Sequence, residues 1–181
     1  MNERGLKMAF IDLARQRYSE RYFSSKPVEQ EKLDLILEAG RIAPTGCNYQ
    51  PQRIYVIQSE DAKQKALKVR ASWCGCPLAL LVCYDKNEVW KNPRDRCYEE
   101  YNCGEQDTSI VAASMMFQAE ELGVHSLWIR GFDSQNVIDA FELPENEVPV
   151  MILALGYPSE QSHPAHLHES RKKLEETVKY I

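Results

Sequence analysis

One short loop constrains this chain more than any other stretch of its sequence. Pro44 and Pro51 bracket six residues, Thr45-Gly46-Cys47-Asn48-Tyr49-Gln50. Because proline fixes its φ angle and lacks a backbone N–H, while glycine and asparagine favour turns, this stretch cannot continue a helix. An apolar helical pattern ends at Ala43 and a β-branched run begins at Arg53. We therefore expect a tight loop held between a helix and a strand.

The same loop carries polar groups that suit a ligand. The side-chain amides of Asn48 and Gln50 each offer donors and an acceptor, which match the edge of a planar heterocycle better than a phosphate. Loops anchored at both ends often carry binding groups. An ordinary connection whose amides cap neighbouring backbone is the alternative, and the loop alone leaves it open.

Helices and strands alternate irregularly along the rest of the chain. Helical spacing of apolar residues predicts helices over about 8–15, 33–40, 62–69, 108–122 and 134–141. β-Branched or continuously apolar runs predict strands over 53–57, 78–84, 126–129 and 149–155. Regular strand–helix units are too few for a doubly wound sheet, so we expect an α+β layered fold. With 181 residues and no internal repeats, the chain (1–181) is expected to form a single domain.

The helix expected over residues 108–122 differs from the others. Its apolar residues lie on nearly every side of the helical cylinder: Ile110, Val111, Ala112, Ala113, Met115, Met116, Phe117 and Ala119. Such a helix should be buried all round, either in the domain centre or in a subunit interface. Asp107 or Thr108 is expected to cap it, and Gly123 to end it.

Residues 85–106 have no steady hydrophobic period. Charged residues are interspersed there with Trp90, Cys97, Tyr98, Tyr101 and Cys103. A long irregular insert in a compact domain is usually a functional lid or simply mobile. The sequence therefore leaves open whether this variable segment is a substrate-side flap or disordered surface.

A basic cluster near the start of the chain offers a candidate anion site. Arg17-Tyr18-Ser19-Glu20-Arg21 places two guanidinium groups around a hydroxyl. Bidentate charged donors with a neutral hydroxyl donor suit a phosphate monoester. Arg171 and Lys172, near the other end of the chain, could complete the same site. A solvated basic loop is the simpler explanation of either group taken alone.

Composition and motifs exclude several classes of function. The net charge of -5 and the pI near 5.5 give no electrostatic footprint for nucleic acid. The sequence has no dinucleotide-binding glycine loop, no Walker A loop and no His-Glu-x-x-His motif, so an enzyme of this kind would draw its reactivity from a bound organic cofactor. The first residues do not resemble a signal peptide, and no apolar run is long enough to span a bilayer, so we expect a cytoplasmic protein with no membrane partner.

The six cysteines are expected to be mostly reduced in that compartment. Cys83 lies inside an apolar strand run and is predicted to be core packing. Four thiols could form a metal centre or a dithiol relay, but their spacing fits zinc and iron–sulfur motifs poorly, and we predict no metal site. These four are Cys74, Cys76, Cys97 and Cys103.

Four segments taken together resemble the FMN-dependent nitroreductases. Residues 17–23 are similar to that family's Arg-x-Ser-x-Arg-x-Phe opening, and residues 43–51 to its Ala-Pro-Ser-x-x-Asn-x-Gln-Pro loop. Residues 107–129 resemble its central helix and the strand after it. Leu155-Gly156-Tyr157-Pro158 with Arg171 resembles its C-terminal signature. Each segment alone is modest evidence for the family. The order of the four segments along the chain, which is the order found in the family, is more specific evidence.

The resemblance implies a layered fold with a central, mostly antiparallel sheet flanked by helices. It also implies a homodimer with one FMN in each of two sites at the subunit interface. In the family, NAD(P)H reduces FMN and leaves, and a small conjugated or nitro-containing acceptor then takes its place, which is ping-pong hydride transfer. We therefore expect an FMN-dependent NAD(P)H oxidoreductase without a catalytic side chain. The alternative is a flavin-binding carrier or sensor with little turnover.

The resemblance also implies roles for individual residues. Arg17 and Ser19 would hold the flavin phosphate, and Arg21 would lie near the ribityl chain and the N1–C2=O edge. A cation there stabilises the charge of the reduced ring. Residues 45–50 would approach from the partner subunit, and Arg171 with Lys172 would add phosphate contacts. The full candidate set is Arg17, Tyr18, Ser19, Arg21, Pro44, Thr45, Gly46, Asn48, Gln50, Ile129, Arg130, Gly131, Arg171 and Lys172.

Two residues depart from the family pattern. Gln52 stands where many relatives have tryptophan after the Gln-Pro pair. Arg130 occupies a position often held by a small residue beside the flavin, where it could narrow the site or attract an anionic substrate. The resemblance therefore leaves the physiological acceptor open.

Overall fold

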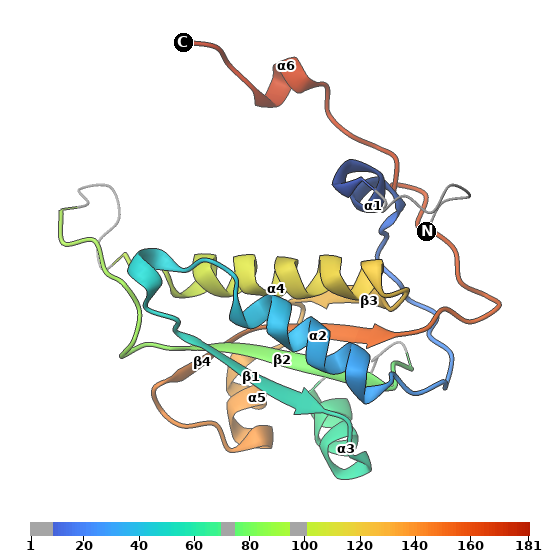
Figure 1. The fold of residues 1–181 in the computed structure, drawn as a ribbon. Coiled ribbons are helices and arrows are strands. Elements are labelled where there is room, and N and C mark those ends of the chain that lie inside the picture. The colour runs from blue at the N-terminus through green and yellow to red at the C-terminus, as the bar shows by residue number, and fades with distance from the viewer. Residues whose placement is uncertain (1–8, 70–74, 95–100) are drawn as a thin grey trace.

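Four strands form one antiparallel sheet in the computed structural model, which describes residues 9–69, 75–94 and 101–181 (Figure 1). Along the chain they are β1 (Gln52–Ile57), β2 (Leu78–Asp85), β3 (His125–Ile129) and β4 (Glu147–Gly156). Their order across the sheet is β1-β2-β4-β3, and every neighbouring pair is antiparallel. The two continuously apolar runs, β2 and β4, therefore lie in the middle.

The sheet is covered on both faces, which explains why β2 is buried along its whole length. Leu80 and Val82 pack toward α2 (Gln30–Arg41) and α4 (Gly104–Glu121). Leu81 and Cys83 pack into a second cluster, which includes residues of α3 (Glu60–Val69) and α5 (Ser134–Phe141). Alternate side chains of a strand point to opposite faces, so both faces of the run must be apolar. The result is a three-layer α+β fold.

Two helices lie apart from these layers. No residue of α1 (Phe10–Gln16) is buried, and its described contact with the body includes Phe10, whose ring centroid is 5.0 Å from that of Phe117 on α4. The short α6 (Leu174–Thr177) stands away from the sheet at the end of an extended tail (Figure 1). Within the described residues, no helix has the length and apolar character needed to cross a membrane.

The expected α+β fold with an antiparallel sheet is confirmed, and each expected helix and strand is present. The predicted cap of α4 is wrong. The helix begins at Gly104, so Asp107 and Thr108 lie inside it, where both side chains are buried. Asn102 instead accepts a hydrogen bond from the Gly104 N–H at 2.9 Å through its side-chain oxygen. α4 is not buried all round within one chain, because Ile110 is 44% exposed, so of the two expected settings only burial in a subunit interface stays as a prediction.

The insert after β2 is shorter than expected, because β2 includes Asp85 and α4 starts at Gly104. Its described ends lie side by side. Lys91 pairs with Asn102 in an antiparallel bridge, and the Cys103 N–H donates to the Trp90 carbonyl at 3.0 Å. Residues 95–100 lie outside the described residues.

Candidate functional site

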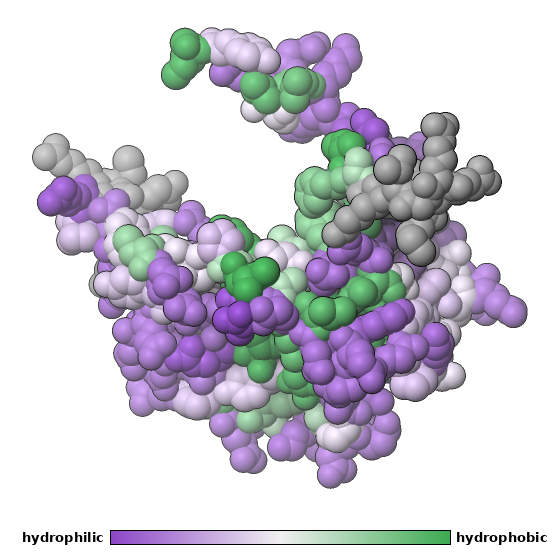
Figure 2. Space-filling view, in the orientation of Figure 1, coloured by the Kyte–Doolittle hydropathy of each residue, from purple (hydrophilic) through white to green (hydrophobic). Residues whose placement is uncertain are grey.

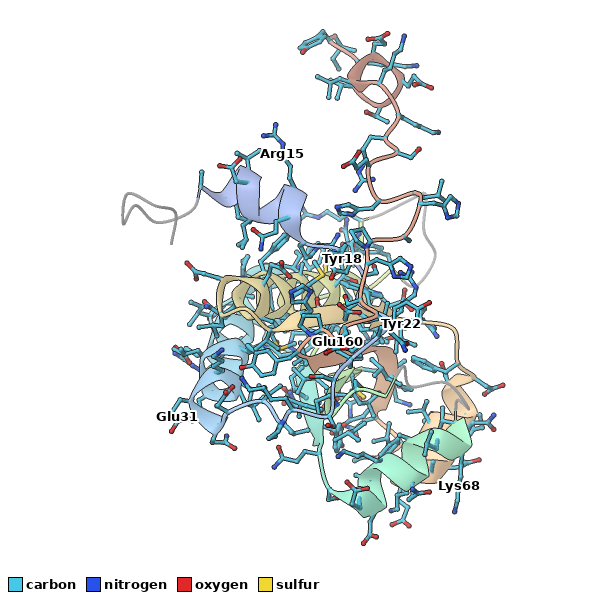
Figure 3. All side chains as sticks on the ribbon, turned by 90° about the vertical axis from the view of Figure 1, so that its right-hand side faces the viewer. Arg15, Tyr18, Tyr22, Glu31, Lys68 and Glu160 are labelled. Carbon is cyan, nitrogen blue, oxygen red and sulfur yellow. The ribbon has the colours of Figure 1, made fainter. Side chains whose placement is uncertain are left out.

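One cavity of about 220 Å³ is lined by residues from both ends of the chain. The first wall is the segment after α1, and the second wall is part of the tail after β4. Figure 3 shows the tail meeting the first segment close to Tyr18 and Tyr22. The lining residues are Arg17, Tyr18, Ser19, Arg21, Ala165, Leu167, His168 and Arg171.

Backbone pairing with the sheet positions the first wall. Ser19 forms a parallel bridge with Ser126 of β3, and the Glu20 N–H donates to the Ser126 carbonyl at 3.0 Å. Farther along, Phe23 pairs with Pro158, directly after β4. The alternation of an extended strand then sends the Glu20 side chain inward and its neighbours toward the cavity.

Three arginine side chains line the cavity. Arg21 donates to the Ser19 carbonyl at 2.9 Å, and Arg171 donates to the carbonyls of His168 and Ser170 at 2.6 and 2.7 Å. Carbonyl acceptors hold a guanidinium in place without neutralising its charge. No carboxylate is among the described residues that line the cavity. Three guanidinium groups, a serine hydroxyl and a histidine form a donor set suited to a phosphate.

A buried polar cluster lies beneath the cavity, and sequence reasoning missed it. Glu20 is fully buried, and Glu120 of α4 is nearly so. The Nδ1 atom of His125 lies 3.6 Å from Oε2 of Glu20. Burial raises the pKa of Glu120, while His125 and Arg17 lower it. The one available signal was a carboxylate set between two arginines, which resembles an ordinary surface charge.

The loop after α2 has the tight form that its prolines predict. It contains a 3-10 turn, η1 (Gly46–Asn48), and three non-glycine residues with left-handed backbones: Cys47 (φ 47°), Asn48 (φ 60°) and Gln50 (φ 52°). Such backbones are uncommon outside glycine and are found where the surrounding structure holds them. Two hydrogen bonds do so here. Oδ1 of Asp107 accepts from the Gly46 N–H at 2.9 Å, and Oγ1 of Thr45 accepts from the Gln50 N–H at 3.0 Å.

The loop after α2 lies near the start of α4, and the segment after α1, which lines the cavity, lies near the end of α4 (Figure 1). Asp107, which holds the loop, is in the first turns of the helix, and Glu120, beneath the cavity, is at its end. At a rise of ~1.5 Å per residue, the two positions are about 20 Å apart. One chain therefore brings Arg17, Tyr18, Ser19, Arg21 and Arg171 together and leaves the loop residues elsewhere.

The remaining candidate residues do not line the cavity. Lys172 follows Arg171 but is exposed outside it, and Pro44, Asn48 and Gln50 are exposed on the loop. The Ile129 side chain packs in the core, so only its backbone is available to a ligand. Arg130 is exposed, with its guanidinium carbon 5.1 Å from the centre of the Phe132 ring.

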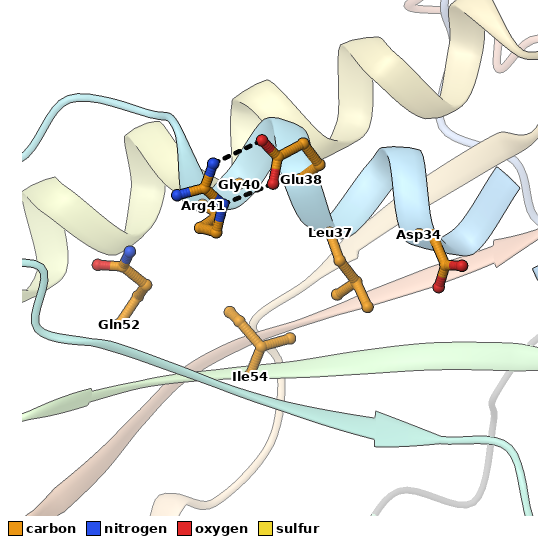
Figure 4. Close-up of a pocket in the computed structure, with 7 residues that line it drawn as sticks. All are labelled: Asp34, Leu37, Glu38, Gly40, Arg41, Gln52 and Ile54. Atoms are coloured by element: carbon orange, nitrogen blue, oxygen red, sulfur yellow. Dashed lines mark hydrogen bonds and ion pairs between the residues drawn. The ribbon is translucent and has the colours of Figure 1, made fainter. Parts of the chain in front are cut away.

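Two further cavities have a different chemistry. One of about 420 Å³ lies between α2 and β1 (Figure 4), where the Arg41 guanidinium is already paired with both oxygens of Glu38. Asp34 also lines it, so it suits an anion poorly. Gln52, which was noted above as a departure from the family pattern, lies at this cavity. The second, of about 530 Å³, lies beside the described ends of the insert and is lined by Lys86, Asn87, Val89, Lys91 and Asn102.

The cysteines divide by environment. Cys83 is fully buried in the core, as predicted, and burial raises the pKa of its thiol to about 12. Cys47 is exposed on the loop, and Cys103 is buried beside Gly46. Cys74 and Cys97 lie outside the described residues, so the expectation that the four cysteines form no metal site stays a prediction.

Comparison with known proteins gives a consistent result. The model of the Nitroreductase family matches residues 14–74 and 66–157. The chain is 30% identical over 159 residues to an FMN reductase (NAD(P)H) of Bacillus subtilis, a match that covers 80% of this chain and 64% of that one. It superposes on a nitroreductase family protein of Clostridium difficile 630 with a TM-score of 0.88 and 43% identity, over 96% and 98% of the two chains. An FMN-dependent nitroreductase of Clostridium difficile R20291 shares the fold, with a TM-score of 0.72 and 23% identity over 94% and 98%.

Proposed function

The chain belongs to the nitroreductase family, and we propose that it is an FMN-dependent NAD(P)H oxidoreductase that reduces a small conjugated or nitro-containing acceptor by ping-pong hydride transfer. The observation that carries this proposal is the meeting of Arg17, Ser19 and Arg171, from opposite ends of the sequence, in one cavity. The similarity to an FMN reductase supports the choice of flavin.

The cavity fits the phosphate end of FMN. Its donors are charged guanidinium groups and a hydroxyl, which suit a phosphate monoester. Its volume of about 220 Å³ suits the phosphate and the adjoining part of the ribityl chain. Arg17, Ser19 and Arg171 would hold the phosphate, and Arg21 would stabilise negative charge toward the ring. When bound, FMN supplies the redox chemistry by accepting a hydride from NAD(P)H and passing electrons to the acceptor.

A second copy of the chain would supply the other half of the site. The loop at residues 45–50 is about 20 Å along α4 from the cavity, and a two-fold arrangement with antiparallel α4 helices would bring the loop of one protomer to the cavity of the other. Figure 2 shows apolar residues at the surface around α1 and α4. The tail also exposes apolar side chains, with Leu174 67% and Tyr180 92% exposed. Exposed apolar groups of this kind commonly mark an interface.

The proposed activity is tested on the purified protein supplied with FMN. We expect a yellow protein whose flavin absorbance is bleached by NADH or NADPH without oxygen and restored by a quinone or nitroaromatic acceptor. Colour without pyridine nucleotide oxidation would instead indicate a flavin carrier or sensor. A protein that stays colourless and shows no affinity for FMN would contradict the proposal.

A further inference from the structure

We propose that Glu20 is a positioning residue that holds the two walls of the arginine-lined cavity together in the shape that the phosphate of FMN requires. Glu20 does not line the cavity and is fully buried beneath it. The inference rests on the proposed function, because it takes the phosphate of FMN as the ligand.

The Glu20 carboxylate shapes the first wall directly. Its Oε1 atom accepts hydrogen bonds from the backbone N–H groups of Arg21 and Tyr22, at 2.9 and 2.7 Å. Its Oε2 atom accepts from the Tyr18 hydroxyl at 3.1 Å. These hydrogen bonds fix the backbone of residues 18–22 around the Glu20 side chain. They thereby orient Tyr18 and Arg21, which line the cavity.

The same carboxylate reaches the second wall. The Ser162 hydroxyl donates to Oε2 of Glu20, and it lies 2.6 Å from the Tyr18 hydroxyl. Ser162 comes shortly before the tail residues His168 and Arg171, which line the opposite side of the cavity. Glu20 is thus the buried contact between two segments that are more than a hundred residues apart in the sequence.

This contact matters because the tail has no regular secondary structure of its own, and Glu20 is the fully buried group among those that hold it. Residues 159–173 contain neither helix nor strand, and Leu167 is 62% exposed. Other described contacts also join the tail to the first wall: the Ser159 N–H donates to the Tyr22 carbonyl at 2.8 Å, Tyr22 stacks on His163, and the His168 ring lies edge-on to Tyr18 with centroids 6.0 Å apart. His168 Nε2 also lies 3.2 Å from the Arg15 carbonyl of α1. A tail ordered before binding loses less conformational freedom when the ligand arrives. Without the Glu20 contact, binding of the phosphate would also have to order the tail that carries Arg171 before Arg171 could contact the ligand.

The surroundings of Glu20 show a carboxylate with a defined set of partners. Four donors point at it from Tyr18, Arg21, Tyr22 and Ser162. Other titratable groups lie close by: Arg17 in the first wall, His125 at the start of β3 and Glu120 at the end of α4. The Gln16 side chain, at the end of α1, also interacts with Glu120 and lowers its pKa. Glu20 differs from Glu120 because it accepts hydrogen bonds from both Tyr18 in the first wall and Ser162 in the tail.

Three substitutions separate positioning from folding. Glu20→Ala removes all four contacts. Glu20→Gln keeps them, because its oxygen can accept from the two N–H groups and its amide can donate to the two hydroxyls. Ser162→Ala removes only the contact with the tail. The matched control is Tyr55→Phe, which removes another hydrogen bond from a tyrosine to a buried carboxylate, Tyr55 to Glu147 at 2.6 Å, on the β1 side of the sheet.

The readout is the ratio of FMN to riboflavin affinity, measured by flavin fluorescence titration. Riboflavin lacks the phosphate, so this ratio reports the phosphate contacts alone. We expect a fall in the ratio of about 30-fold for Glu20→Ala and about fivefold for Ser162→Ala, the size of effect that lost hydrogen bonds to a charged group produce. Glu20→Gln and Tyr55→Phe should stay within about threefold of the wild type.

The outcomes distinguish the two proposals. A wild-type protein that binds FMN no better than riboflavin would overturn the phosphate assignment in the proposed function. A normal wild-type ratio that persists in both Glu20→Ala and Ser162→Ala would overturn the role of Glu20. Equal weakening of both flavins would show general loss of structure and also count against a positioning role. If Glu20→Ala does not fold, Ser162→Ala decides: an unchanged ratio of FMN to riboflavin affinity in that variant would overturn the role of Glu20.

Discussion

At the scale of single residues, the chain concentrates unusual chemistry in two places. The loop holds Cys47, Asn48 and Gln50 in left-handed backbones, and the segment before β1 thereby presents its polar groups outward. The cavity gathers guanidinium groups above the buried Glu20. The arginines and the loop could be picked out from the sequence, because guanidinium groups suit anions and closely spaced prolines and glycine indicate a tight loop. Glu20 was not, because only the fold distinguishes a buried carboxylate with four donors from a solvated one.

Arg17→Ala is expected to weaken FMN binding by about 10- to 100-fold, because a charge-assisted contact with a phosphate is lost. The dissociation constant can be measured by fluorescence titration. Arg15→Ala is the matched control, because Arg15 is exposed, pairs with Asp12 at 3.6 Å and does not line the cavity. Equal flavin affinity in the two variants would contradict the phosphate assignment.

A second residue-level prediction concerns acid stability. The Tyr157 hydroxyl donates to Glu29 and, with smaller contributions from the Glu29 backbone and Lys26, lowers the pKa of that carboxyl from 4.5 to about 2. Because the folded-state pKa is depressed, the stabilisation is present above about pH 4.5 and is lost as the pH falls through about 2.

Tyr157→Phe should therefore lower the Tm at pH 7, and the difference from the wild type should shrink toward pH 2. Thermal unfolding across this range measures it, with Glu29→Gln as a second variant that should behave alike. A Tm difference that does not change with pH would refute the assignment.

At the scale of secondary-structure elements, hydrophobic periodicity located every strand and helix of the layers, because burial dictates that pattern. The start of α4 was missed because the cap position is held by Cys103, which is not a common cap residue, and the first helical residue is a glycine. Asp107 and Thr108 are residue types that cap helices often. Asp107 is instead needed inside the helix, where it holds the loop through Gly46. The chemistry of the loop thus overrides the usual signal for a helix start.

Gly104 shows how closely α4 begins against the sheet. An added Cβ there would come within 2.5 to 2.7 Å of the Tyr84 ring. Gly104→Ala is expected to destabilise the fold by about 1–3 kcal/mol through overpacking, which lowers the Tm by about 2–4 °C per kcal/mol in a chain of this size. Thermal or urea unfolding measures the change. The exposed neighbour Glu105 offers the control, since Glu105→Gln should leave the Tm close to that of the wild type.

At the scale of the whole molecule, one chain carries the cavity and the loop at separate places, and the proposed dimer would join the cavity of one copy to the loop of the other. The resemblance to the family indicated which residues belong to the cavity and which to the loop, and it led to the expectation of a dimer. The separation of the cavity and the loop along α4 is a property of the tertiary structure, which no local pattern records. Ile110, exposed in the middle of α4, is the residue that a two-fold contact along this helix would cover.

Ile110→Arg is therefore expected to shift the protein from dimer to monomer and to reduce the flavin that it retains, because a charge would be buried in the contact. Light scattering coupled to gel filtration gives the mass and the flavin absorbance together. Leu35→Arg is the control, since Leu35 of α2 is similarly exposed, at 50%. A monomeric protein with full flavin content would contradict the shared site.

The placement of the loop and the cavity at opposite ends of α4 has a genetic consequence. Each pair of chains would build two catalytic centres, and each centre would draw on both chains. A chain with an inactivating substitution at Arg17 and a chain with one at Asn48 would each be inactive when expressed alone. When the two chains are co-expressed, they would form mixed dimers. One centre of a mixed dimer would contain both substitutions and the other would contain neither. Intragenic complementation would therefore restore up to half of the activity of each mixed dimer.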